Sequence, residues 1–168
     1  MIIPTDISFR QKLYDHIKLR EGYKNVVYLD TLGKPTGGIG HLLSSSERKT
    51  FPLGCIIKES IIKEWYDKDI QKSLDACNEQ CKILNVFDTE FKIALTSVNF
   101  QLGTKWYRKF PSAWKALCHK EYDKAIDEVL YANKEEKRYS KWYKQTPVRV
   151  KDFITAIENI KGEQNATR

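Results

Sequence analysis

The chain has 168 residues, the usual size of one domain, and its 41% hydrophobic and 30% charged residues are ordinary for a globular protein. No segment is long and apolar enough to span a bilayer, so a membrane protein is excluded and we expect no membrane insertion. The formal net charge is +7. It indicates an anionic partner, either nucleic acid or an acidic cell-envelope polymer, or simply a solvated surface, and composition does not separate these.

The amino terminus lacks the basic region, apolar core and cleavage site of a secretory signal, so we expect a protein made without a signal peptide in the cytoplasm. Few cysteines are present for this length, and free thiols are the default in a reducing compartment. Cys77 and Cys81 lie four residues apart, but no second pair of His or Cys residues with metal-ligand spacing is near them in the sequence. We therefore predict no metal site and no cofactor. The cysteines are Cys55, Cys77, Cys81 and Cys118.

Apolar residues recur at four-residue steps as far as Ile17, which predicts a helix over about residues 6–21. Glu21 is the next position on this stripe, and it precedes Gly22, a natural helix stop. A carboxylate on a buried face loses hydration, and at a helix C-terminus it faces the negative end of the dipole, so both effects favour the protonated acid. The alternative is a glutamate that bends outward at the helix end.

A β-branched and aromatic run at residues 25–29, followed by turn residues, predicts a strand, a turn and a returning strand that begins at Thr36. Asp30 would lie at the strand end near solvent, where ionisation is easy, although an ordinary turn aspartate fits the same position. Two carboxylates in unlike settings suit acid and base chemistry on a glycosidic bond. The nearby glycines and Lys34 do not match a phosphate-binding loop.

Farther along, residues 42–53 are predicted as a polar connection, and a long helical pattern then extends from about 57 to 81. This helix suits a connection between two lobes as well as a place in one bundle. Asp88 is predicted to cap the next helix, which stops at Gly103.

Two shorter helical patterns follow, and the charged stretch at 133–141 is predicted as a solvated helix end or loop. Thr146 and Pro147 are typical of a helix start, with threonine as the cap and proline at the first helical position. Gly162 is expected to end this helix, and the polar tail after it is expected to be disordered.

Three ordered motifs point to one family. The first runs from Glu21 to His41, with Asp30 nine residues after Glu21 and Thr36 six residues after Asp30, and it resembles the T-even bacteriophage lysozyme family of endolysins. The segments Asn-Phe-Gln-Leu-Gly at 99–103 and Lys-Trp-Tyr-Lys-Gln-Thr-Pro-Val-Arg at 141–149 resemble two later motifs of that family in the same order.

The resemblance implies a mostly α-helical α+β fold in one lysozyme-like domain over residues 1–168. It comprises a small N-terminal β-sheet lobe at about 22–58, a connecting helix at 59–81, and a helical C-terminal lobe at 82–162 to which the helix at 6–21 returns. The substrate groove would lie between the lobes. The implied reaction is hydrolysis, with inversion, of the β-1,4 bond between N-acetylmuramic acid and N-acetylglucosamine in bacterial peptidoglycan.

Carried over by position, Glu21 matches the family's general acid, Asp30 the carboxylate that positions or deprotonates water, and Thr36 the residue that helps hold this water. Other positions match supporting and substrate-binding roles. Arg149 matches an arginine that contacts the catalytic glutamate, His41 and Asp69 match an ion pair between the sheet and the long helix, and Leu42, Phe100 and Gln101 match residues near the sugar groove.

Two departures from the family accompany these matches. Gly37 stands after Thr36 where the family usually has a branched apolar residue, so we expect a looser strand there. The connection from His41 to Gly54 is shorter than in the T-even enzyme by about a short helix, and the charged stretch before Trp142 is longer.

We therefore expect a monomeric endolysin that waits in the host cytoplasm until lysis and then cleaves the cell wall, held to anionic envelope polymers by its basic surface. Two alternatives belong to other classes. One is a non-catalytic wall-binding or virion structural protein that kept the lysozyme fold, and the other is a basic nucleic-acid-binding module. The second lacks any recognisable reading motif, so no specific nucleic acid is expected as a partner.

Overall fold

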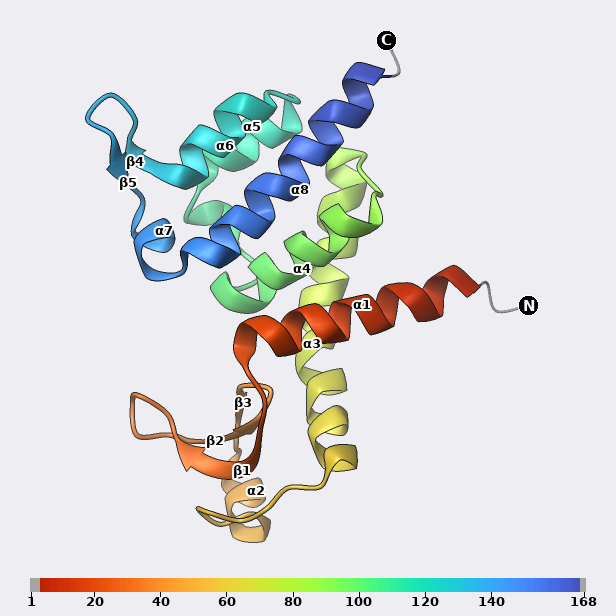
Figure 1. Ribbon diagram of the computed structural model, residues 1–168, viewed down its shortest axis with the longest axis vertical. Helices are drawn as coiled ribbons and strands as arrows, with labels where there is room; N and C mark the ends of the chain where they lie inside the picture. The colour runs from red at the N-terminus through yellow and green to blue at the C-terminus, as the bar shows by residue number, and fades with distance from the viewer. Residues whose placement is uncertain (1–3, 167–168) are drawn as a thin grey trace. The chain divides into compact units, whose positions relative to one another are not determined.

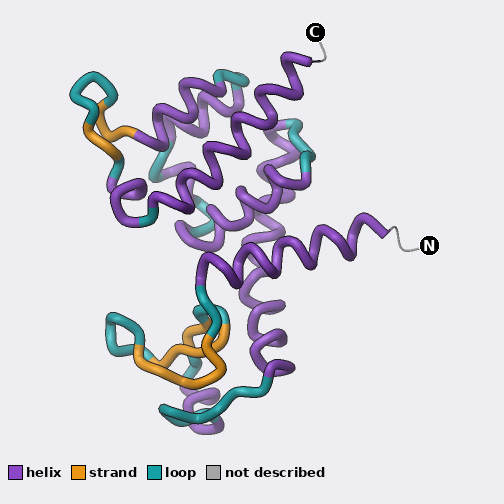
Figure 2. The backbone as a smooth tube through the Cα atoms, viewed as in Figure 1, coloured by secondary structure: helices purple, strands orange, loops and turns teal. Residues whose placement is uncertain are grey.

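Helix α1 (Pro4–Glu21) opens the part of the chain that the structure, a computed structural model, describes, which is residues 4–166. The chain divides into two compact units, Met1–Lys72 and Ser73–Arg168. The long helix α3 (Glu59–Leu84) begins in the first unit and continues into the second (Figures 1 and 2). Helices predominate and one small antiparallel sheet follows α1, so the prediction of a mostly α-helical α+β fold is confirmed.

The sheet of the first unit has three antiparallel strands in the order β1 (Lys24–Leu29), β2 (Pro35–Gly38) and β3 (His41–Leu42). In the register, Tyr28 lies opposite Thr36, and Thr36 lies opposite Leu42. Because directly opposed residues share a face, these three side chains lie in a row across the sheet. The predicted pair of strands on either side of the Asp30 turn is confirmed.

Gly37 in β2 is tightly packed, which differs from the loose strand expected from the sequence. Thr36, Gly37 and Gly38 are all buried, and a methyl group placed on Gly37 would lie 2.6 Å from Cδ1 of Ile57. Ile57 itself is only 2% exposed. The missing side chain of the glycine is therefore replaced by an isoleucine from another segment, which fills the space beside the strand.

A short helix, α2 (Ser45–Thr50), lies within the segment predicted as a polar connection. A capping box begins it: the amide of Glu47 donates to Oγ of Ser44, and the carboxylate of Glu47 accepts from the amide of Ser44. No side chain of α2 is buried, so periodicity gave no signal for it. The Ser-x-x-Glu spacing is the one local feature that predicts this helix start.

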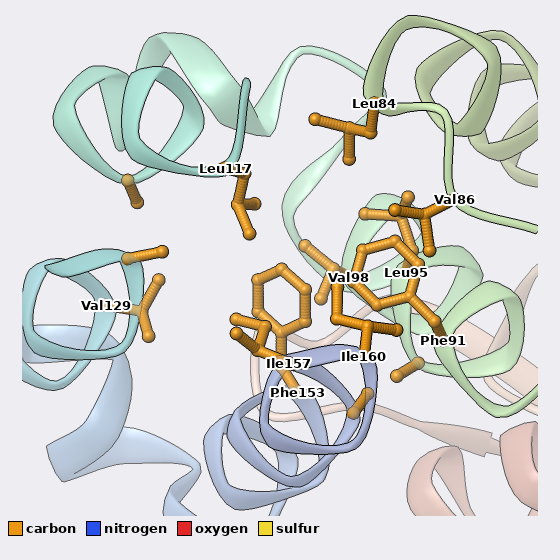
Figure 3. Packing of buried hydrophobic residues seen from close by; sticks show 14 of the residues in the cluster. Leu84, Val86, Phe91, Leu95, Val98, Leu117, Val129, Phe153, Ile157 and Ile160 are labelled. Atoms are coloured by element: carbon orange, nitrogen blue, oxygen red, sulfur yellow. The ribbon is translucent and has the colours of Figure 1, made fainter. Parts of the chain in front are cut away.

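The second unit is helical. The end of α3 is followed by helices that pack around one apolar core, in which Phe153 and Phe91 are fully buried (Figure 3). The rings of Trp106 and Phe153 are nearly perpendicular, at 87°, with ring centroids 5.7 Å apart. The elements are α4 (Thr89–Leu102), η1 (Trp106–Arg108), α5 (Pro111–Cys118), α6 (Tyr122–Leu130), α7 (Lys141–Gln145) and α8 (Pro147–Ala166).

Several helix ends follow the sequence signals. Asp88 caps α4 by accepting from the amide of Phe91 at 2.9 Å, as predicted, and Gly103 follows the helix with a φ of 95°. Pro147 is the first residue of α8, also as predicted. The hydroxyl of Thr146, expected to cap α8, instead donates to the carbonyl of Trp142 and accepts from the side chain of Gln101.

Two predictions for the second unit need correction. Within the charged stretch at 133–141, residues 134–137 form an exposed turn, as the loop prediction has it, but this turn closes a hairpin of β4 (Tyr131–Asn133) and β5 (Arg138–Tyr139), in which Tyr131 and Tyr139 stack across the strands at 5.4 Å. Charged residues at the hairpin tip hide the strand pattern. Helix α8 continues through Gly162 to Ala166 where a disordered tail was expected, and residues 167–168 lie outside the described part.

Two further observations bear on the predicted organisation. The four cysteines are free thiols, with the sulfur atoms of Cys77 and Cys81 3.9 Å apart. Within residues 4–166, none of the helices has the length and apolar character that crossing a bilayer requires. The sub-lobe boundaries, and the return of the first helix to the C-terminal lobe, stay predictions.

The close packing of Gly37 predicts the effect of a methyl group there. We expect Gly37→Ala to lower the free energy of unfolding by about 1–3 kcal/mol, because its Cβ overlaps Cδ1 of Ile57. In an Ile57→Val background, which removes Cδ1, the same change should cost clearly less. Denaturant unfolding of the four variants in this cycle measures both effects, and an equal cost in both backgrounds would contradict the proposed overlap.

Gly162→Ala provides the control for this cycle. Gly162 lies within α8 and has open space around it, so alanine should stabilise the protein by about 0.5–1 kcal/mol through backbone entropy and helix propensity.

Candidate active site

Glu21 is the last residue of α1, and its side chain lies beside the turn that connects β2 and β3. The amide of Gly22 closes the helix by donating to the carbonyl of Lys18, and Gly22 has a φ of 85°. A methyl group on Gly40, in the turn between β2 and β3, would lie 3.6 Å from Oε2 of Glu21. The half-buried carboxylate of Glu21 therefore lies over a glycine whose φ of 64° a side chain rarely adopts.

Asp30 lies directly after β1, and its carboxylate is fixed by the turn that it begins. The amides of Leu32 and Lys34 both donate to Oδ1, each at 2.8 Å. Oδ2 takes part in neither bond. The side chain is half-buried. An aspartate that accepts amides two and four residues ahead is typical of a turn, so the local sequence alone sets this orientation.

Thr36 is buried, only 5% exposed, and is oriented by the same turn. Its hydroxyl donates to the carbonyl of Lys34 at 3.0 Å, which leaves the oxygen lone pairs to accept hydrogen bonds. The carbonyl of Lys34 also accepts from the amide of Asp30 at 2.9 Å. The peptide groups of one residue, Lys34, thus hold both Asp30 and Thr36 and set their relative position.

His41, the first residue of β3, bridges two carboxylates. Its Nδ1 lies 2.7 Å from Oδ2 of Asp69 on α3, and its Nε2 lies 3.0 Å from Oε2 of Glu47 on α2. The imidazole also stacks on the indole of Trp65, with ring centroids 4.4 Å apart. The expected pairing of His41 with Asp69 is present, and the contact with Glu47 is an addition that the sequence did not predict.

The two carboxylates determine the charge of His41. Burial lowers the pKa of His41, but the hydrogen bonds and charges of Asp69 and Glu47 outweigh this effect and raise the pKa above its ordinary value. Burial likewise raises the pKa of Glu47, and its bonds to Ser44 and His41 outweigh burial and lower it. Both nitrogens of the protonated ring can then donate, one to each carboxylate.

The site residues predicted in the second unit are held by partners of their own. Gln101 donates from Nε2 to the hydroxyl of Thr146 and accepts from the indole of Trp142, both at 2.9 Å, so the orientation of its amide is fixed. Phe100 is half-buried, unlike the residues on the apolar stripe of α4. In the first unit, Leu42 is 49% exposed, and it lies opposite Thr36 in the sheet register.

Arg149 is half-buried in the first turn of α8, and its Nη2 donates to the hydroxyl and the carbonyl of Ser97, at 3.0 and 3.3 Å. The expected contact between Arg149 and the catalytic glutamate stays a prediction. Sequence reasoning did not identify Ser97, Trp142 and Thr146 as the groups that orient the predicted site residues, since their contacts join distant parts of the chain.

The chemistry available is that of carboxylates, a hydroxyl and backbone dipoles. Among residues 4–166, no group of three or more His, Cys, Asp and Glu side chains is arranged to hold a metal ion. Glu21 sits at a helix end over a turn, whereas Asp30 is bound by amides. The two carboxylates therefore occupy different surroundings, which is the arrangement that divides acid and base roles.

Comparison with known proteins assigns the chain and its fold to one class. The family model described as phage lysozyme matches residues 18–145. A probable T4-type lysozyme 2 of Dictyostelium discoideum is 27% identical over 166 residues, covering 87% of this chain and 93% of the relative.

Two further relatives are longer phage proteins, and this chain matches only a part of each. The peptidoglycan hydrolase gp36 of Pseudomonas phage phiKMV is 28% identical over 80% of this chain but only 14% of its own length. The pre-baseplate central spike protein Gp5 of Enterobacteria phage T4 is 24% identical over 86% of this chain and 27% of its own.

The chain belongs to the phage lysozyme family, as its three sequence motifs predicted. It is a lysozyme, a glycoside hydrolase whose substrate is peptidoglycan.

The pairing of His41 with Asp69 and Glu47 is expected to contribute most to the stability of the protein in mild acid. The raised pKa of His41 contributes stability that is complete below about pH 6.5 and is lost as pH rises through the folded-state pKa. The lowered pKa of Glu47 contributes stability that is complete above about pH 4.5 and is lost as pH falls through its folded-state pKa. Both contributions are present together between these values.

We therefore expect His41→Gln to cost about 2 kcal/mol near pH 5.5 and progressively less as the pH rises above about 6.5, because the wild-type advantage depends on a charged ring. Thermal unfolding of both proteins across this range gives the difference, in which all other titrating groups largely cancel. A cost that does not change with pH would show that the bridge acts only through packing on Trp65.

Proposed function

We propose that this lysozyme hydrolyses the β-1,4 bond between N-acetylmuramic acid and N-acetylglucosamine with inversion at the anomeric carbon. Glu21 is the general acid that protonates the leaving oxygen. Asp30 is the base that positions and deprotonates the attacking water, and Thr36 helps to hold this water. The proposed role of the protein is lysis of a bacterial host, after a period in the host cytoplasm.

The observation that carries this proposal is the link through Lys34, whose amide donates to Asp30 and whose carbonyl accepts from Thr36. A base and a hydroxyl held by the backbone of one residue have little freedom relative to each other. Such preorganisation lowers the entropic cost of placing a water molecule for in-line attack. Oδ2 of Asp30 and the oxygen of Thr36 are the two acceptors proposed for this water.

The setting of Glu21 supports its role as the acid. Glu21 is the last residue of α1, and its side chain is half-buried beside Gly40. A glycine there lets the turn approach the carboxylate without a side chain between them.

Phe100, Gln101 and Leu42 are proposed to contact the sugar chain, and Arg149 to support Glu21. The net charge of +7 supports a further partner, the anionic polymers of the cell envelope, by long-range attraction that salt would screen. A monomer is sufficient for this function, because the three proposed catalytic residues lie on one chain.

Removal of the proposed acid should abolish catalysis without unfolding the protein. We expect Glu21→Gln to lower kcat on purified peptidoglycan at least about 100-fold, because glutamine cannot transfer a proton to the leaving oxygen. Glu158→Gln, which changes an exposed carboxylate on α8, is the matched control and should retain wild-type activity.

Turbidity clearance measures the rates, and circular dichroism checks the fold. Equal clearance by wild type and Glu21→Gln would assign the acid to another residue. Absence of clearance by the wild type itself would favour the alternative of a non-catalytic wall-binding protein.

The stereochemical course is a separate prediction. If Asp30 directs water to the face opposite the leaving group, the first product carries an α-anomeric reducing end. Proton NMR of soluble peptidoglycan fragments during the first minutes of cleavage, before mutarotation, distinguishes the anomers. An initial β-anomer would indicate a retaining route and would remove Asp30 from the role of base.

A further inference from the structure

The loop at residues 51–58 lies between α2 and α3 (Figure 1), and it carries two large, exposed apolar side chains. Leu53 is 62% exposed and Ile56 is 73% exposed. Neither has a place in the proposed catalytic reaction. Exposed aliphatic side chains this close together on a folded protein commonly mark an interaction surface.

The exposure of Leu53 and Ile56 comes from a fixed backbone. A turn closed by the bond from the amide of Cys55 to the carbonyl of Pro52 presents Leu53, and Gly54 in this turn has a φ of 83°. The loop then pairs with β1: the amide of Gly54 donates to the carbonyl of Val27 at 2.8 Å, and the amide of Val27 donates to the carbonyl of Cys55 at 3.0 Å.

The next bond of this pairing fixes Ile57. Its amide donates to the carbonyl of Asn25 at 2.7 Å, and its side chain is buried beneath the sheet. Because side chains alternate along an extended segment, burial of Ile57 forces Ile56 outward. Phe51 packs edge-on against Trp65 at the other end of the loop, with centroids 5.3 Å apart. Both ends of the loop are thus anchored, and this holds the side chains of Leu53 and Ile56, its apolar tips, in exposed positions.

Cations flank these tips. Arg48 and Lys49 lie in the last turn of α2, and Lys58 follows the loop; all three are exposed. Against these three cations, residues 44–58 contain one carboxylate, that of Glu47, which already bonds to His41 and Ser44. Glu59, which begins α3, is the next acidic residue. Along the chain, the residues that flank the tips therefore carry a net positive charge.

A second pair of exposed apolar residues shows the contrast. Ile83 is 67% exposed and Phe87 is 61% exposed, values close to those of the loop. Their neighbours in sequence are Asp88 and Glu90, and the nearby Lys82 is paired with Glu79 at 2.9 Å. This pair matches the loop in exposure, but carboxylates lie among its cations, which are Lys82 and also Lys120, whose Nζ donates to the carbonyl of Leu84 at 3.3 Å.

We propose that loop 51–58 is a membrane-docking element, in which Leu53 and Ile56 enter the headgroup region of an anionic lipid bilayer while Arg48, Lys49 and Lys58 attract its surface. The combination of a small apolar tip and surrounding lysine and arginine is what an interfacial contact needs. The contact is peripheral and leaves the fold unchanged. It is also independent of the catalytic proposal.

Lipid suits the loop better than a protein partner does. A stable protein interface buries upwards of about 1,000 Å², with a packed centre, whereas two projecting side chains on a narrow loop cannot supply such a centre. A bilayer yields around projecting groups and presents a continuous negative surface. For an enzyme whose substrate lies next to a membrane, docking would also concentrate it near that substrate.

Co-sedimentation with vesicles tests the proposal. The full chain is mixed with vesicles of phosphatidylglycerol and phosphatidylethanolamine in equal parts, or with phosphatidylcholine vesicles, neither of which contains peptidoglycan. We expect binding to the anionic vesicles, weak binding to the neutral ones, and a decrease at 0.5 M NaCl. The double variant Leu53→Ser/Ile56→Ser should lower the partition coefficient at least about tenfold, since it removes the apolar tips.

The charge and the specificity are tested by two further variants. Lys49→Glu/Lys58→Glu should lower binding to anionic vesicles by a similar factor, whereas Ile83→Ser/Phe87→Ser should leave it unchanged. Circular dichroism and peptidoglycan clearance establish that each variant is folded and active. Wild-type protein that does not bind anionic vesicles, or a loop variant that binds as the wild type does, overturns the proposal.

The remaining outcomes also decide against it. Equal binding to neutral vesicles would remove the role of charge, and an equal loss in the Ile83/Phe87 variant would mean that general hydrophobicity causes binding. A concentration-dependent dimer that the loop variant loses would assign the surface to a second copy of the chain.

Discussion

The imidazole of His41, held between the carboxylates of Asp69 and Glu47, is the contact on which the order of the first unit depends. One ring joins β3 to α2 and to α3, three elements that bury few apolar side chains against one another. Because His41 directly follows Gly40, the bridge also fixes the turn that lies beside the carboxylate of Glu21. These polar contacts thus add to the apolar packing of the first unit, in which Ile57, Ile62 and Trp65 are buried.

The proposed catalytic residues of this lysozyme differ in what fixes their positions. Local backbone contacts orient Asp30 and Thr36, whereas the position of Glu21 depends on a separate helix. Asp30 and Thr36 are oriented by the peptide groups of Lys34, within one turn, and need no other part of the protein to hold them. Glu21 is carried by a helix and lies beside the turn at Gly40. The relative position of base and hydroxyl is therefore a property of a seven-residue segment, whereas that of the acid depends on how α1 and the sheet are joined.

Glycine has two distinct uses around this site. At Gly40 it permits a left-handed backbone and leaves room for the Glu21 carboxylate. At Gly37 the backbone is ordinary, and glycine serves to admit the side chain of Ile57. The same residue, Ile57, forces its neighbour Ile56 into solvent by the alternation of an extended segment. The burial that completes the sheet thus also presents the apolar tip of loop 51–58.

Much of the first unit was predictable from sequence because its signals are local. The four-residue stripe located α1, and the turn residues located the two strands around Asp30. The motif spacing identified the family that comparison then confirmed. Similar local signals, the Asp88 cap and the proline at the start of α8, were also correct. Residues that are near in sequence restrict one another through backbone geometry, so such features need no knowledge of the rest of the chain.

The elements that the sequence did not predict lack such local signals. The helix α2 buries no side chain, and the β4–β5 hairpin carries charges at its tip, so neither shows a periodic apolar pattern. The sequence by itself determined which residues could serve as acid, base and water-binding hydroxyl. Only the tertiary structure decided that Glu47 joins His41, that Trp142 and Thr146 orient Gln101, and that Ile57 fills the space beside Gly37. These contacts join residues that are up to 45 positions apart, and chain spacing carries no information about them.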